Sequence, residues 1–346
     1  MINLGTPESP RPSDVRAYLR EFLMDPRVFD LPGWKRWLVV NLILISRPRA
    51  SGEAYAKIWT EQGSPLRVHG LALAEKVARC LPGVPVEPAM RYGNPSIASA
   101  LDRLRQRGVD KVVAFPLYPQ YSSAANGSSL DKVFSAAAKR WNVPDIETIP
   151  PFYDDPGFIG ACAARARPVI ESVDPEKVYF SFHGLPERHV VKSDDSGEHC
   201  LRSADCCARI GSANRSCYRA QCYATARLLA ERLGIPEEKR VVCFQSRLGR
   251  DPWIRPYTDE IMIEHARAGV KRAVILSPAF VADCLETLEE LGIRAVEDWK
   301  AHGGERLEVA PCVNSDDRWV EALLDIVRRN STAIRACEPV SAGATA

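Results

Sequence analysis

Short apolar runs alternate with amphipathic segments along most of this chain. Four of the runs are rich in β-branched and aromatic residues, as is typical of strands that are buried on both faces of a parallel sheet. These runs are Val112–Leu117, Val178–Phe182, Val241–Gln245 and Ala273–Ser277. Apolar residues recur at helical spacing in the segments Ser96–Arg107, Tyr223–Leu233 and Asp259–Ala268. The alternation predicts an α/β fold with a doubly wound parallel sheet.

One piece of this pattern occurs twice. Residues 107–117 and residues 268–278 each contain a glycine at a helix end, one strand and a proline that ends the strand. The repeat predicts two similar Rossmann-like halves that face each other across a cleft, an N-terminal half of residues 1–150 and a C-terminal half of residues 151–335. The phosphate-binding motifs G-x-G-x-x-G and G-x-x-x-x-G-K-[ST] do not occur in the sequence, which disfavours nucleotide chemistry.

Composition and charge narrow the classes of partner. The chain has 346 residues, 46% hydrophobic and 26% charged, and its net charge of +2 implies no strong field for nucleic acid. The longest apolar run, Trp37–Ile45, is too short to span a bilayer. Because Trp34, Lys35 and Arg36 precede it, the run suits an interfacial or ligand-facing helix, although a plain buried helix fits equally well. We therefore expect a cytoplasmic protein, with peripheral contact at the inner membrane as an open alternative.

Cysteines are concentrated in one segment. Five of the eleven lie within 23 residues: Cys200, Cys206, Cys207, Cys217 and Cys222. An odd number of cysteines without a secretory signal is a poor disulfide framework, whereas thiolates this close are commonly ligands of structural zinc or of an iron–sulfur cluster. We favour the iron–sulfur cluster, with zinc and a metal-free loop as alternatives. Four of the five thiolates would suffice, and we expect only one of Cys206 and Cys207 to bind, because neighbouring side chains point apart in extended backbone.

The residues that could perform chemistry follow the predicted strands, where ligands bind in such folds. His183 ends the run Val178–Phe182, and Phe280, Asp283 and Glu286 follow the run Ala273–Ser277. An imidazole opposite carboxylates can accept protons or hold a divalent cation loosely. Each residue alone is weak support, since Asp283 also fits a helix cap and Glu286 a solvated surface. The aromatic residues that accompany them suit a flat, apolar ligand: Tyr118, Tyr121, Trp253 and Tyr257.

These residues and their order resemble the ferrochelatase family, enzymes that insert ferrous iron into a porphyrin. The matching motifs span most of the chain: Asn3–Pro7, Gly63–Leu66, Met90–Tyr92, Tyr118–Ser122, Gly127–Ser129, Ser181–Pro186, Gln245–Arg247, Asp251–Trp253 and Phe280–Leu288. The resemblance implies two Rossmann-like halves around a porphyrin cleft. It implies that His183 is the proton acceptor for pyrrole N–H groups or a contact of the Fe²⁺ substrate, with Glu286 as its acidic counterpart across the macrocycle. The residues it implies for substrate binding are Arg91, Tyr118, Ser128, Ser129, Trp253, Phe280 and Asp283.

The sequence departs from part of the family's pattern. Cys284 stands where some relatives carry histidine, and Ser123 where the animal type has a cluster ligand. The segment Asp194–Asn214 instead resembles the internal [2Fe–2S] segment of some bacterial members. Protoporphyrin is the expected substrate, and coproporphyrin is the alternative. A non-catalytic iron–sulfur redox sensor on the same fold would need the cysteines but neither His183 nor Glu286. A monomer and a homodimer are equally compatible with the sequence.

Overall fold

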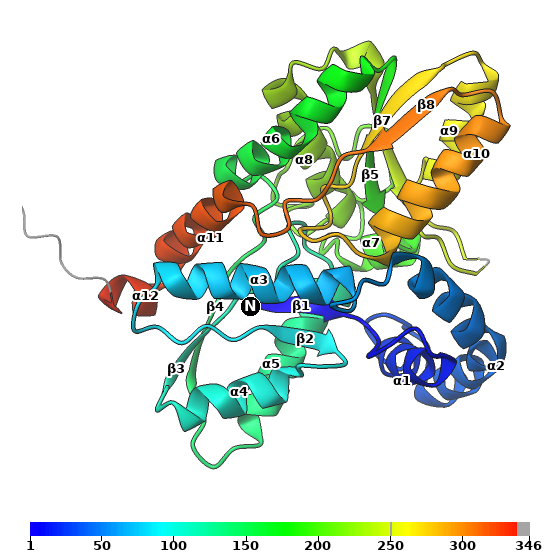
Figure 1. The fold of residues 1–346 in the computed structure, drawn as a ribbon. Coiled ribbons are helices and arrows are strands. Elements are labelled where there is room, and N and C mark those ends of the chain that lie inside the picture. Colours follow the sequence, from blue (N-terminus) through cyan, green and yellow to red (C-terminus); the bar gives the residue numbers. More distant parts are fainter. Residues whose placement is uncertain (250, 338–346) are drawn as a thin grey trace, which may run out of the picture.

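The strands of the N-terminal half form a small parallel sheet. The computed structural model describes residues 1–249 and 251–337 (Figure 1). Its first four strands are β1 (Ile2–Gly5), β2 (Ala89–Tyr92), β3 (Lys111–Ala114) and β4 (Asp145–Thr148). β1 pairs with β2 and β3 pairs with β4. A parallel bridge between Ile2 and Pro116 joins the two pairs, so the spatial order is β2-β1-β3-β4.

The C-terminal half repeats this order. Its strands are β5 (Lys177–His183), β6 (Arg240–Gln245), β7 (Arg272–Leu276) and β8 (Arg306–Val309). They form a parallel sheet in the order β6-β5-β7-β8, again with the second strand before the first, third and fourth. The two segments of the sequence repeat supply β3 and β7, the third strand of each half. The prediction of two similar doubly wound halves is therefore confirmed.

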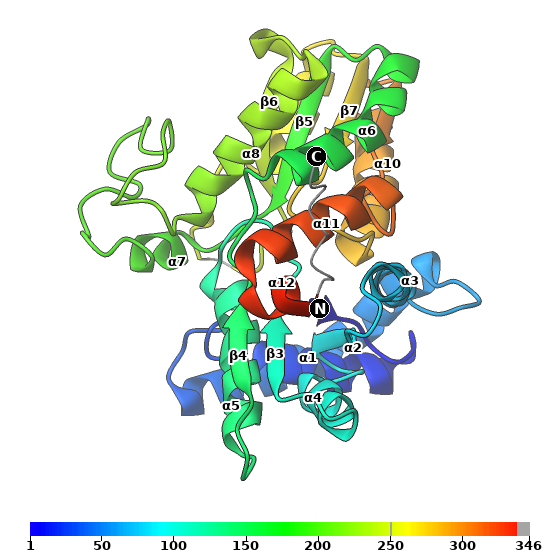
Figure 2. The ribbon, with the colours of Figure 1, turned by 90° about the vertical axis from the view of Figure 1, so that its left-hand side faces the viewer.

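Helices lie on both faces of each sheet (Figures 1 and 2). Those of the N-terminal half are α1 (Pro12–Leu23), α2 (Gly33–Ile58), α3 (Pro65–Cys80), α4 (Ile97–Gln106), the π-helix η1 (Ser123–Gly127) and α5 (Ser128–Ala138). Those that follow are α6 (Pro156–Val173), α7 (Glu187–Lys192), α8 (Tyr218–Leu233), the 3₁₀ turn η2 (Glu237–Lys239), α9 (Thr258–Arg267), the π-helix η3 (Glu286–Ala295), α10 (Val296–Ala301), α11 (Asp317–Asn330) and α12 (Thr332–Cys337). α8 begins five residues before the predicted Tyr223, a difference that places Tyr218 in the helix.

The longest apolar run of the sequence is only partly buried. The run Trp37–Ile45 lies in α2, which buries Val40 and Leu44 but leaves Trp34, 69% exposed, and Ile45, 72% exposed, on its surface. Among residues 1–249 and 251–337, no helix is long and apolar enough to cross a membrane.

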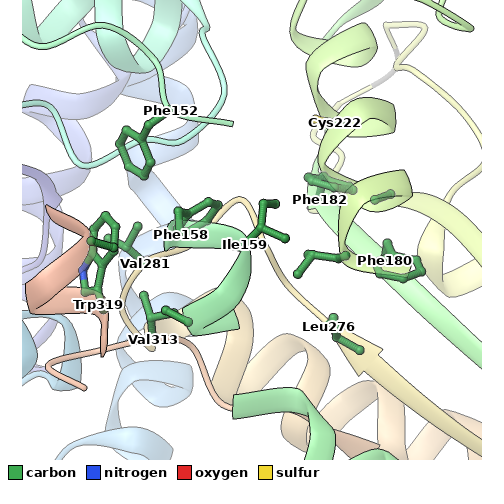
Figure 3. Close-up of a cluster of buried hydrophobic side chains, with 14 of the residues drawn as sticks. Phe152, Phe158, Ile159, Phe180, Phe182, Cys222, Leu276, Val281, Val313 and Trp319 are labelled. Carbon is green, nitrogen blue, oxygen red and sulfur yellow. The ribbon is translucent and has the colours of Figure 1, made fainter. Parts of the chain in front are cut away.

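One buried core spans the junction of the two halves, because Phe115 packs against Phe152 with ring centroids 5.5 Å apart. Figure 3 shows part of this core on the C-terminal side. Phe152, Phe158 and Trp319 pack ring against ring, with centroids 5.2 to 5.6 Å apart. Phe158 stands in the first turn of α6, which Asp155 caps by accepting hydrogen bonds from the backbone N–H groups of Gly157 and Phe158. The C-terminal helices return to the N-terminal half, where Asp317 pairs with Lys76 at 2.6 Å. The division near residue 150 remains a proposal, because α11 contacts both halves.

Candidate functional site

His183 is the last residue of β5, and its ring is held from one side. Its Nδ1 lies 2.7 Å from the carbonyl oxygen of Gly184. A carbonyl only accepts, so Nδ1 carries the proton of the neutral ring and Nε2 is left as an acceptor. Two aromatic rings flank the imidazole, those of Trp253 and Phe280, each with its centroid 6.4 Å away. The expected grouping of these three residues is present.

Gly184 makes the close approach of these elements feasible. A Cβ at this position would lie 2.9 Å from the carbonyl oxygen of Gln245 and 3.1 Å from the ring of Trp253. The Gly184 N–H also donates to that carbonyl at 2.8 Å, which prolongs the β5–β6 pairing beyond His183. A larger residue would separate the imidazole from the tryptophan.

Glu286 begins the π-helix η3, and Glu290 lies on the same side of it. Residues four apart on a helix are neighbours on its surface. Burial raises the pKa of Glu290, the charge of Glu286 raises it further, and His183 acts in the opposite direction. All three groups are therefore close enough to interact. The sequence analysis missed Glu290, although the four-residue spacing from Glu286 was a usable signal.

Glu290 is held by a strained residue. Ser246, directly after β6, donates to its carboxylate from the backbone N–H at 2.9 Å and from Oγ at 2.6 Å. Ser246 adopts φ +66°, a left-handed conformation that few residues other than glycine take. A cavity of about 230 Å³ adjoins this pair and is lined by Arg247, Thr258, Arg294 and Asp298 among others.

Asp283 lies before the helix that carries Glu286. Its carboxylate accepts hydrogen bonds from the backbone N–H of Cys312 at 3.2 Å, from Asn314 at 2.7 Å and from Thr287 at 3.1 Å. Asp283 therefore connects the start of η3 to the segment after β8. This structural role resembles that of a helix cap, the other interpretation of Asp283 that the sequence allows.

The predicted binding residues of the N-terminal half are largely paired with one another. Arg91 forms an ion pair with the buried carboxylate of Asp25 and donates to Ser128 Oγ at 2.6 Å. Ser129 Oγ donates to the phenol oxygen of Tyr118 at 3.2 Å. Arg91 thus offers no free charge to a ligand.

A cation that the sequence analysis missed lies beside this group. The side chain of Arg27 is 42% exposed and donates to Ser123 Oγ at 3.0 Å. The Asp25 carboxylate accepts a hydrogen bond from the Arg27 backbone N–H at 2.7 Å, which positions the residue. Arg27 is the more accessible of the two guanidinium groups, since its side chain is 42% exposed and that of Arg91 is 11% exposed.

The N-terminal half approaches the C-terminal site at three places. Tyr18 and Tyr55, from α1 and α2, lie close enough to Glu286 for its charge to raise their pKa values, although burial is the larger cause. Ion pairs join Lys57 to Glu289 at 3.2 Å and Asp30 to Arg188 at 2.7 Å. The site therefore lies where the two halves meet.

The cysteine segment connects α7 to α8, and four of its five thiols lie in contact with one another. Cys217 contacts both Cys200 and Cys207, and the Sγ atoms of Cys206 and Cys207 are 3.7 Å apart. The expectation that Cys206 and Cys207 point apart is wrong, because the backbone forms a turn there and is not extended. Cys222 lies within α8 beside Phe182 in the core (Figure 3).

These thiols do not form a preorganised ion site. Within the described ranges, no group of three or more His, Cys, Asp or Glu side chains is placed to hold a metal ion. Contact with Cys217 and burial raise the pKa of Cys207, and burial raises that of Cys200 and Cys206. Arg219 opposes this with a guanidinium 3.2 Å from the Cys207 sulfur.

The fold is similar to that of solved chelatase structures. One is SirB from Bacillus subtilis with Fe³⁺, which aligns with a TM-score of 0.52 and 16% identity over 79% of this chain and 94% of its own. Another is the sirohydrochlorin chelatase SirB from Bacillus subtilis subspecies spizizenii in complex with cobalt, with a TM-score of 0.51 and 15% identity over 79% of this chain and 92% of its own. At this identity the likeness concerns the fold alone.

The sequence comparisons reach further. A family model described as Ferrochelatase matches residues 1–331. A curated ferrochelatase of Pseudomonas fluorescens is 46% identical over 335 residues, which cover 96% of this chain and 98% of the relative. One of Pseudomonas putida is 47% identical over 331 residues, which cover 95% and 98%. Together with the site at the junction of two parallel sheets, these matches show that the chain belongs to the ferrochelatase family.

Proposed function

We propose that the protein inserts Fe²⁺ into protoporphyrin IX to give protoheme, with release of two protons, and that His183 and Glu286 carry out this reaction. The observation on which the proposal depends is His183, which lies between two aromatic rings and close to Glu286 and Glu290 and whose Nε2 has no hydrogen-bond partner among the described residues. Fe²⁺ is the second substrate of this reaction and not a resident cofactor.

Proton removal is the part of the reaction that these residues suit. Two pyrrole protons must leave as the metal enters, and His183 Nε2 is the group that can accept them. Glu286 and Glu290 offer carboxylate oxygens to a divalent cation or to a departing proton. The raised pKa of Glu290 makes it a better proton acceptor than an ordinary surface carboxylate. Water in the adjoining cavity would receive the protons.

The aromatic rings would act on the macrocycle. A metal can enter only when the porphyrin is bent enough for its pyrrole lone pairs to point out of the plane. The rings of Trp253 and Phe280 lie beside the imidazole and are tilted to it by 47° and 58°. If these walls bind a bent ring more tightly than a flat one, they lower the barrier to insertion.

The choice of protoporphyrin over coproporphyrin follows from the charges available. Coproporphyrin carries four propionates and would need several free cations near the rim. Arg91 is already paired with Asp25, and Arg27 shares its guanidinium with Ser123 and, at 3.8 Å, with Asp131. This supply suits the two propionates of protoporphyrin better.

We also propose that the cysteine segment binds a [2Fe–2S] cluster through four of its five thiols. The contacts favour Cys200, Cys206, Cys207 and Cys217 as ligands, because Cys217 contacts Cys200 and Cys207 and the Cys206 and Cys207 sulfurs are 3.7 Å apart. Cys222, within α8, contacts the Tyr218 phenol. Binding requires these thiols to rotate and lose their protons, as metal binding generally does. Arg219 beside Cys207 would favour the thiolate. When bound, the cluster supplies a covalent staple to a segment with little apolar content, and insertion of Fe²⁺ needs no electron from it.

A cytoplasmic location with peripheral contact at the inner membrane is the third part of the proposal. The exposed apolar residues of α2 recur at helical spacing: Trp34, Trp37, Leu38, Leu42 and Ile45. A stripe with two tryptophans and the basic pair Lys35 and Arg36 at its start is typical of a helix that lies in a membrane interface. The porphyrin itself is the alternative occupant of this face.

His183→Ala should lower kcat for metal insertion by about 10²- to 10⁴-fold, because the proton acceptor is lost. The measurement is the anaerobic rate with Fe²⁺ and protoporphyrin, with His302→Ala as a control, since His302 is a partly exposed residue after α10. Retention of more than about a tenth of the rate would contradict the assigned role. A higher kcat/KM with coproporphyrin would select the alternative substrate, and no insertion by the unmodified protein would favour a redox sensor.

Serine at Cys200, Cys207 or Cys217 should abolish the visible sulfur-to-iron absorption of anaerobically purified protein and lower its melting temperature. Among the remaining two, Cys206→Ser should have the same effect and Cys222→Ser should leave the spectrum unchanged. Iron and sulfide analysis is the direct check. Stoichiometric zinc, or neither element, would refute the cluster.

Replacing Trp34 and Ile45 together by serine should reduce binding to vesicles of phosphatidylethanolamine and phosphatidylglycerol by at least about tenfold, because two large apolar side chains no longer leave water. Trp141→Ser is the matched control, since Trp141 is 99% exposed on another surface. Unchanged vesicle binding with a raised KM for porphyrin would assign the face to the substrate instead.

A further inference from the structure

The first residue of α8 reaches the backbone of the catalytic strand. The Tyr218 phenol donates to the main-chain carbonyl of His183 at 2.9 Å. Tyr218 is buried, and its hydroxyl must be the donor in this pair because a carbonyl oxygen only accepts. Tyr218 follows Cys217 directly and is therefore tied to the cysteine segment by one peptide bond.

This hydrogen bond holds the peptide groups that determine the orientation of the His183 imidazole. The His183 carbonyl, held by Tyr218, belongs to the peptide whose N–H, that of Gly184, donates to Gln245 at 2.8 Å. The next carbonyl, that of Gly184, accepts the Nδ1 proton of His183. If the His183–Gly184 peptide rotated, the Gly184 carbonyl would move as well. The Nδ1–H of His183 would then lose the acceptor that fixes its tautomer.

The first turn of α8 also contacts the segment of the N-terminal half that carries Tyr118. Gln221, one turn after Tyr218, accepts from the backbone N–H of Tyr121 at 2.6 Å and donates to the carbonyl of Arg215 at 2.7 Å. Arg215 lies in the cysteine segment, and Tyr121 lies in the segment that carries Tyr118. The start of α8 thus connects the cysteine segment to both halves of the site.

We propose that Tyr218 is a positioning residue for His183 and that, through it, the cysteine segment sets the orientation of the proton acceptor. The inference rests on the proposed role of His183. Tyr218 touches neither metal nor porphyrin in this account, so its effect should appear in proton transfer and not in substrate affinity.

The test is Tyr218→Phe, which removes one hydroxyl and keeps the ring. We expect kcat to fall about 5- to 30-fold, as loss of a buried hydrogen bond allows, with the KM for porphyrin within about twofold of wild type. The acidic limb of the pH–rate profile should shift. In ¹⁵N-histidine-labelled protein, the His183 signals should change from a single Nδ1–H tautomer to a mixture.

Tyr223→Phe is the matched control, because Tyr223 is on the same helix and its hydroxyl contacts Arg219 at 3.3 Å and not the site. It should retain wild-type kcat and His183 signals. A second variant, with 3-fluorotyrosine at position 218, keeps the donor and should restore kcat.

Wild-type kcat, pH profile and tautomer in Tyr218→Phe, together with an inactive His183→Ala, would overturn the positioning role alone. An active His183→Ala would overturn the role of His183 and this inference with it. A loss in the fluorotyrosine variant as large as that in Tyr218→Phe would assign the effect to ring packing and also overturn the proposal.

Discussion

The account depends on how the chain is held immediately after β5. There the sheet ends, and the backbone must turn without releasing the imidazole that the chemistry needs. Pairing with β6 runs as far as His183 and Gln245 and is extended by the Gly184 N–H. The phenol of Tyr218 then holds the His183 carbonyl from the side of α8. A side chain fixed through its own backbone can be oriented without a rigid partner in the open part of the site.

The second half of the site is an acidic pair on η3. Glu286 and Glu290 are four residues apart, a spacing at which side chains on a helix are neighbours. Their proximity comes at the expense of repulsion between the two carboxylates. Burial and that repulsion both raise the pKa of Glu290. The donors on Ser246, which adopts a strained backbone, partly offset this, so the acidic pair is retained where the proposed reaction uses it.

The parts that the sequence predicted are those that follow from local pattern. The strands, their repeated third member and the position of His183 at a strand end all depend on residues close in the chain. What the local pattern does not predict is the set of partners far away in sequence. Arg91 is paired with Asp25 on another element, and Asp283 is taken up by Asn314 beyond β8. Neither pairing leaves a periodic signal.

The cysteine segment shows the same limit. Its turn at Cys206 is held by the Asn214 side chain, which donates to the carbonyls of Cys206 and Arg209 at 3.0 and 2.8 Å. No strand or helix period predicts such a contact, so extended backbone was the natural expectation. The sequence pattern does not predict the contact of Tyr218 either, because its partner is the main-chain carbonyl of His183. The helical pattern also begins only at Tyr223, after this residue.

The most direct test of the central claim, that the cysteine segment and the site form one unit, is hydrogen exchange on the Cys217→Ser variant. Cys217 stands at the N-cap of α8, so the substitution disturbs the segment where it enters the helix. The account predicts that protection is lost in residues 194–217 and also in residues 181–185 and 118–122, while β3 and β4 exchange as in the wild type. Loss confined to residues 194–217, with the backbone around His183 unchanged, would contradict it.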